Sequence, residues 1–153
     1  LSYGNAVIPE LLMLAGRHFS DTKMIDGGIT LLQWLIKVET ENDHFSVTPH
    51  NGWSNGETRP RFDQQSIEVA ALVDACATAF DVTNNPEWLT YIERGLAWFE
   101  GANDSATQMY DPLTGAGFDG LTPSGRNENR GAESTLSYLS VVQRKNAYLE
   151  ILL

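Results

Sequence analysis

Two polar segments of the chain carry acidic and amide side chains at a density that suits chemistry on a neutral, hydroxyl-bearing ligand. Residues 59–68 read RPRFDQQSIE, and residues 126–135 read RNENRGAEST. Each segment leads directly into an apolar stretch of helical length. A helix N-terminus stabilises carboxylates and presents free N–H groups. Both segments are therefore candidate sites.

Pairs of carboxyl groups that face a cavity are what glycoside hydrolysis requires, one as the acid and the other as the base or nucleophile. The apolar faces of sugar rings also stack on aromatic side chains. The candidate catalytic acids are Glu68, Asp119, Glu128 and Glu133. The candidate substrate-binding residues are Trp53, Arg61, Asp63, Gln65, Tyr110, Asn127 and Asn129. Structural roles stay open for several of them: Asp63 can cap the following helix, and loop aromatics can pack onto the core.

Composition excludes several classes of partner and cofactor. The formal net charge of −10 over 153 residues repels phosphate backbones and anionic membranes, so we expect neither nucleic acid nor membrane as a partner. The single cysteine, Cys76, lies in an apolar run and is expected in the core of a cytoplasmic protein. His18, His44 and His50 do not lie at metal-ligand spacing with an acid, so we expect no metal and no other cofactor.

Five helical segments must position these residues, and we expect them at 5–19, 22–40, 64–82, 86–101 and 132–153. Asp21, Asp63 and Asn85 are candidate N-caps. The first, third and fifth segments are apolar nearly all round, which predicts buried inner helices, whereas the second and fourth are amphipathic and predict outer helices. No segment alternates apolar and polar residues over the length of a strand, so no sheet is expected.

An internal repeat with an offset of 61 residues relates Phe19 to Phe80 and residues 42–43 (Asn-Asp) to residues 103–104 (Asn-Asp). Repeated helical hairpins are typical of α/α toroids and solenoids. The long loops at 41–63 and 102–131 then lie at the N-termini of the inner helices. We expect one pocket there, lined by Arg61, Asp63, Gln65, Glu68, Asp119, Asn127, Glu128, Asn129 and Glu133.

The fold class predicted for residues 1–153 is a single all-α domain that forms about half of an α/α-six toroid. A half-ring leaves the flanks of its end helices without neighbours. The first helix would then expose some of Val7, Ile8, Leu11, Leu12 and Leu14, and the fifth some of Leu136, Leu139, Val142 and Leu149. We therefore expect a C-terminal part of a longer toroid, whose N-terminal half is missing, or a homo-oligomer. The absence of an initiator Met and the apolar end at residues 151–153 favour the same interpretation.

The strings FDQQSIE at residues 62–68 and NENRGAEST at residues 127–135, with YDP at 110–112 between them, resemble a bacterial family of helical domains. The resemblance extends over nearly the whole chain. It implies an α/α-six toroid, similar in fold to several glycoside hydrolases and sugar epimerases and often attached to a glycosyltransferase. Residues 128–133 are also distantly similar to the catalytic helix of inverting cellulases, which implies an acid role for Glu128 or Glu133. Epimerases of this fold use histidines on inner helices, and the segments 64–82 and 132–153 have none.

Three functions are compatible with these observations. The leading one is a carbohydrate-active domain that binds a glycan in an acidic cleft and cleaves it with paired carboxylates. The alternative is a non-catalytic module that positions glycan for an attached glycosyltransferase, and a third is a scaffold whose loops bind protein. Carboxyl groups that face each other across an open cleft would favour hydrolysis. Acids occupied in caps and ion pairs would favour the module.

Overall fold

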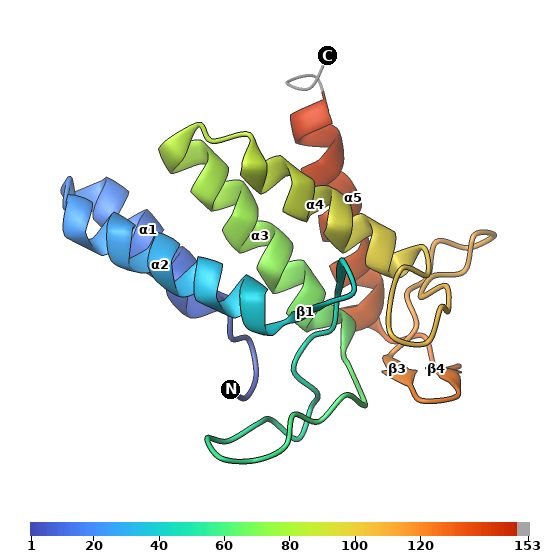
Figure 1. The fold of residues 1–153 in the computed structure, drawn as a ribbon. Coiled ribbons are helices and arrows are strands. Elements are labelled where there is room, and N and C mark those ends of the chain that lie inside the picture. The colour runs from blue at the N-terminus through green and yellow to red at the C-terminus, as the bar shows by residue number, and fades with distance from the viewer. Residues whose placement is uncertain (150–153) are drawn as a thin grey trace.

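The computed structural model describes residues 1–149 and is rich in helix (Figure 1). Its helices are α1 (Val7–Phe19), α2 (Thr22–Val38), α3 (Ser66–Thr83), α4 (Glu87–Phe99) and α5 (Ala132–Leu149). Its strands are β1 (Thr40–Glu41), β2 (His44–Phe45), β3 (Gly120–Thr122) and β4 (Gly125–Asn127). The number and order of the predicted helices are confirmed.

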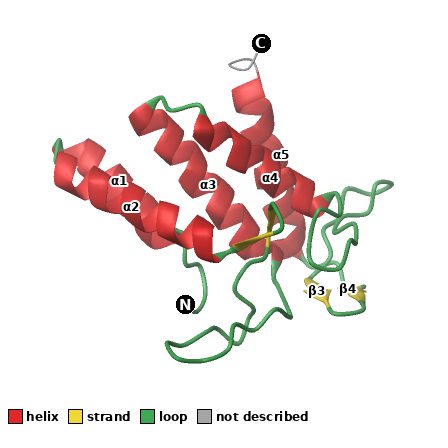
Figure 2. Cartoon of the chain, in the orientation of Figure 1, coloured by secondary structure: helices red, strands yellow, loops and turns green. Residues whose placement is uncertain are grey.

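The expectation that the chain contains no sheet is wrong, because the structure has two small sheets of two strands each. β1 pairs with β2 and β3 pairs with β4, each as an isolated antiparallel hairpin. Strands of two or three residues are too short to show an alternating pattern, which needs about four to eight residues. Each hairpin lies inside one of the two long loops. These loops gather at the end of the molecule where α3 and α5 begin, as Figure 2 shows.

The helices form two layers, one of α1, α3 and α5 with α3 in the middle, and one of α2 and α4. Helices α1 and α5 pack on either side of α3, while α2 packs against α1, and α4 packs against α3 and α5 (Figure 1). Helix α3 is buried over most of its surface, including Val69, Leu72, Val73, Ala75 and Cys76, whereas Ile67, Ala71 and Asp74 are half-buried on one side. The prediction of a buried third helix and a core cysteine is therefore confirmed.

Helices α1 and α5 are buried on one side only, which corrects the expectation that they are enclosed all round. Exposed apolar side chains are Val7, Ile8, Leu11 and Phe19 on α1, and Leu136 and Leu139 on α5. Val7, Ile8, Leu11, Leu136 and Leu139 are among the residues that the half-ring interpretation expects to be exposed, and two of them, Val7 and Leu136, line a groove beside α3. Leu12, Leu14 and Val142 are half-buried. The side chain of Leu149 and the apolar end at 151–153 lie outside the described residues.

The helix boundaries follow from local hydrogen bonding. The Asp21 carboxylate accepts hydrogen bonds from the backbone N–H groups of Lys23 and Met24 at 2.9 and 3.3 Å, which confirms it as the N-cap of α2. The Asn85 side chain accepts from the N–H of Glu87 at 3.0 Å. Asp63 does not cap α3, because the N-cap position belongs to Gln65, two residues later. The side chain of Asp63 is therefore available to a ligand.

Two adjacent glycines in α2 report on its packing against α1. A Cβ atom on Gly28 would lie 2.7 Å from Cγ of Met13 and 2.8 Å from the backbone oxygen of Pro9, whereas a Cβ on Gly27 would meet nothing within 4 Å. We expect Gly28→Ala to lower the free energy of unfolding by about 1–3 kcal/mol. Gly27→Ala should raise it by about 0.5–1 kcal/mol. Urea denaturation of both variants measures this, and equal effects would contradict the close packing of α2 on α1 at Gly28.

Candidate functional site

A short backbone pairing joins the two long loops. The N–H of Gln64 donates to the oxygen of Leu121 at 3.1 Å, and the N–H of Leu121 donates to the oxygen of Gln64 at 2.8 Å. Residues 63–65 thus add a third extended segment beside the β3–β4 hairpin. Successive side chains of extended segments point to opposite faces. Gln64 and Leu121 are both fully buried, so their sequence neighbours occupy the outer face.

The outer face of this pairing is a small polar hollow. Its volume is about 200 Å³, and it is lined by His50, Asp63, Gln65, Asp119, Gly120, Thr122 and Asn127. The N–H of His50 donates to the backbone oxygen of Asp63 at 3.1 Å, which holds His50 beside the first loop. Asn127 is brought in by strand pairing, because it lies opposite Gly120 in the β3–β4 register.

Asp119 is the most firmly held acid of the hollow. Its Oδ1 accepts hydrogen bonds from the N–H of Gly131 and from Oγ of Ser134, both at 2.6 Å. Its own N–H donates to the backbone oxygen of Asn129 at 3.0 Å. No hydrogen bond within residues 1–149 occupies Oδ2 of Asp119. The carboxylate is thus oriented at the start of α5 with one oxygen left to accept from a ligand.

Two of the predicted catalytic acids instead anchor residues 3–5. Glu68 is buried and accepts from the N–H groups of Gly4 at 2.5 Å and Asn5 at 3.3 Å. Burial raises the pKa of Glu68, and these hydrogen bonds oppose the rise. Glu133 accepts from the hydroxyl of Tyr3 at 3.0 Å. Both acids lie on the same side of the molecule, as expected, but neither lines the polar hollow.

The other predicted site residues are dispersed. Glu128 is exposed and forms an ion pair with Arg126 at 3.0 Å. The backbone N–H of Asn129 donates to the side-chain oxygen of Asn127 at 3.0 Å, so Asn129 contacts a residue of the hollow without lining it. The ring of Tyr110 stacks on Tyr138 of α5 with a centroid distance of 4.5 Å. Tyr110 therefore packs against a helix.

Arg61 and Trp53 also lie outside the polar hollow. Arg61 donates to Asp104 at 2.7 Å, and Trp53 lines a different hollow together with Trp34. The structure thus brings together Asp63, Gln65, Asp119 and Asn127 out of the nine residues expected in one pocket. The single-pocket expectation is wrong for the other five, whose side chains or backbone groups have protein partners.

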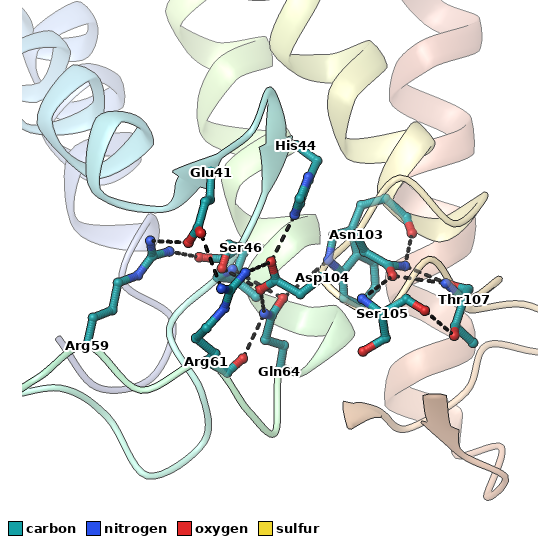
Figure 3. Close-up of polar contacts among 12 residues, drawn as sticks. Glu41, His44, Ser46, Arg59, Arg61, Gln64, Asn103, Asp104, Ser105 and Thr107 are labelled. Atoms are coloured by element: carbon teal, nitrogen blue, oxygen red, sulfur yellow. Dashed lines mark hydrogen bonds and ion pairs between the residues drawn. The ribbon is translucent and has the colours of Figure 1, made fainter. Parts of the chain in front are cut away.

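Sequence reasoning did not single out Asp104, which organises a polar cluster between the two loops (Figure 3). Its side chain is fully buried. Its two oxygens accept from His44 at 2.9 Å, Ser46 at 2.5 Å, Arg61 at 2.7 Å and Gln64 at 2.5 Å. Burial by itself would raise the pKa of Asp104, but these four hydrogen bonds outweigh it and lower the pKa to about 2. The cluster holds the side chain of Gln64 in place. It thereby stabilises the backbone pairing of Gln64 with Leu121, which forms the polar hollow.

A larger groove of about 670 Å³ runs between α1, α3 and α5. Its lining is mainly apolar, with Val7, Ile67, Ala71 and Leu136 among the residues that form it, and Glu133 lies on its wall. Within residues 1–149 there is no group of three or more His, Cys, Asp or Glu side chains that could hold a metal ion. No helix in this part of the chain has the length and apolar character to cross a lipid bilayer.

No model of a known protein family matches this chain, and no curated protein sequence matches it significantly. The resemblance to glycosyltransferase-associated helical domains therefore stays a prediction from the sequence. The geometry of the polar hollow has to carry the functional argument.

Proposed function

We propose that this chain binds a neutral carbohydrate in the polar hollow lined by Asp63, Gln65, Asp119 and Asn127. The observation that carries the proposal is the Gln64–Leu121 pairing, which places carboxylate and amide groups from two distant loops on one face. Carboxylates accept from sugar hydroxyls, and amides both donate and accept. A chain with a net charge of −10 favours a neutral ligand over a phosphorylated one.

Binding without cleavage is the form of this function that the contacts support best. Glu68 and Glu133 hold residues 3–5, and Glu128 is paired with Arg126. These three acids are therefore occupied in structural contacts. We propose a glycan-positioning domain, arranged as about half of an α/α toroid and working beside an attached glycosyltransferase. The free flanks of α1 and α5 support the half-ring part of this proposal.

Glycoside hydrolysis is the second candidate, and one observation favours it. Asp63 and Asp119 both line the hollow, so a carboxylate pair faces the same space. In this mechanism one carboxyl would protonate the leaving oxygen and the other would act as base or nucleophile. Release of reducing sugar that stops in Asp63→Asn and Asp119→Asn would establish hydrolysis. Binding with no release would establish the positioning function.

Isothermal titration with neutral oligosaccharides tests the binding site. Asp119→Asn keeps an oxygen to accept from Gly131 and Ser134 but removes the charge offered to the ligand. Losing a hydrogen bond to a charged group costs about 1.5–3 kcal/mol, so we expect binding to weaken roughly 10- to 100-fold. The matched control is Asp26→Asn on the exposed surface of α2. Equal affinities for the two variants would contradict the proposal.

A further inference from the structure

Trp34 is an exposed aromatic residue on the outer helix α2. Its side chain is 49% exposed, although the neighbouring outward positions of α2 are polar, as at Thr30, Gln33 and Lys37. A scattered exposed apolar residue needs no explanation. Trp34, however, lines a concave surface together with Trp53, a second tryptophan from a different part of the chain.

That surface is an aromatic hollow of about 320 Å³, lined by Leu1, Trp34, Trp53, Ser54, Asn55 and Gly56. Its volume lies at the lower end of the range for small-ligand sites, about 300–1,000 Å³. The lining combines two tryptophans with two polar residues, Ser54 and Asn55. None of these residues belongs to the polar hollow.

The Trp53 indole is held in place by its own loop. Its Nε1 donates to the backbone oxygen of Glu57 at 2.9 Å, and its backbone N–H donates to the oxygen of Leu1 at 2.9 Å. The N–H of Ser54 donates to the carboxylate of Glu57, also at 2.9 Å. A ring fixed in this way loses little conformational freedom when a ligand stacks on it.

The chemistry of the aromatic hollow fits a neutral sugar ring. A pyranose has an apolar C–H face that packs on an indole, and hydroxyls at its edge that bond to groups such as those of Ser54 and Asn55. The hollow also lies close to the polar one along the chain. His50 of the polar hollow lies in a turn that is closed by the Gly52 N–H and the Pro49 oxygen at 2.8 Å, and Trp53 of the aromatic hollow follows this turn directly.

We infer that Trp34 and Trp53 form a second sugar subsite, so that the ligand is an oligosaccharide with one ring in the aromatic hollow and another in the polar hollow. This inference rests on the proposed function for the polar hollow. Trp34 is the new element, because it lies on a helix that the candidate site otherwise does not use.

The test is titration of neutral oligosaccharides of increasing length, from a monosaccharide upward, into the chain and its variants. Affinity should rise with length in the wild-type chain. Trp34→Ala should weaken oligosaccharide binding about 10-fold or more and leave monosaccharide binding in the polar hollow unchanged. Trp34→Phe, which keeps an aromatic face, should restore most of the loss. Phe19→Ala is the matched control, because Phe19 is 71% exposed and lines neither hollow.

The outcomes separate the two proposals. If Asp119→Asn weakens binding while Trp34→Ala behaves as Phe19→Ala does, the aromatic subsite is wrong and the polar site stands. If no oligosaccharide binds the wild-type chain, both are wrong. Binding of a proline-rich peptide that requires Trp34 in place of a glycan would also overturn the inference, because polyproline segments dock on aromatic-lined grooves as well.

Discussion

Replacing Asp104 with asparagine is expected to lower the free energy of unfolding by about 3–5 kcal/mol. Every acceptor position around this buried carboxylate is occupied by a donor, from His44, Ser46, Arg61 and Gln64. An amide NH₂ in place of either oxygen would face two of these groups, and one of the two, Arg61 or the amide nitrogen of Gln64, can only donate and would lose its acceptor. Chemical denaturation monitored by circular dichroism measures the loss.

The internal repeat provides a matched control for this variant. Asp43 occupies the position equivalent to Asp104 in the first hairpin but is exposed in the β1–β2 turn, where its φ is +64°. Asp43→Asn should change the free energy of unfolding by no more than about 0.5 kcal/mol. If Asp104→Asn were as mild as Asp43→Asn, the cluster could not be what joins the two loops.

The stability of the domain should fall as the pH rises above about 5, and the carboxyl of Glu39, whose pKa is raised to about 7, should contribute most to this fall. This residue follows α2, and its side chain is 1% exposed. Its Oε1 accepts from the N–H and the hydroxyl of Thr48, while Oε2 has no partner within residues 1–149. Burial is the largest influence on this carboxyl and raises its pKa from 4.5 to about 7.

A raised folded-state pKa means that the folded protein binds the proton of Glu39 more tightly than the unfolded chain does. The stability that this proton contributes is fully present below the unfolded pKa of 4.5 and is lost as the pH rises through about 7. The shift corresponds to roughly 3 kcal/mol.

We therefore expect the free energy of unfolding to be lower at about pH 8 than at about pH 5. In Glu39→Gln, which cannot ionise, most of this difference should disappear. Urea denaturation at the two pH values measures it, with Glu93→Gln on the exposed face of α4 as the control that keeps the wild-type dependence. A pH dependence that persists in Glu39→Gln would assign the effect to another group.

The parts of the fold that the sequence predicts are those with a strong local pattern. Helix α3 is recognisable because its own residues are apolar or small on most of its surface. The start of α2 is recognisable because the Asp21 side chain accepts a hydrogen bond from the backbone of the residue two positions later. The repeat correctly relates the ends of α2 and α4, at Val38 and Phe99. The apolar composition of α1 by itself predicts an enclosed helix, because composition does not tell an enclosed helix from one with a free side; only the half-ring interpretation predicts its exposed residues.

The parts of the site that escaped prediction depend on contacts between distant residues. Asp104 meets partners 40 to 60 positions away, and nothing next to it in the sequence marks it as buried. The Asn-Asp repeat includes Asp104 but does not predict that its side chain is buried, because Asp43 in the equivalent position is exposed. Trp34 lies in a segment whose pattern predicts only an amphipathic helix, and the structure places it in the lining of the same hollow as Trp53.

An NMR titration of the labelled chain with the tightest-binding neutral oligosaccharide tests the central claim most directly, because it reports binding residue by residue. We predict the largest amide shifts at Asp63, Gln65, Asp119 and Asn127, the residues that line the polar hollow. Shifts confined to the apolar groove between α1, α3 and α5, at Val7, Ile67 and Leu136, would contradict the claim, as would an unchanged spectrum at the highest ligand concentration.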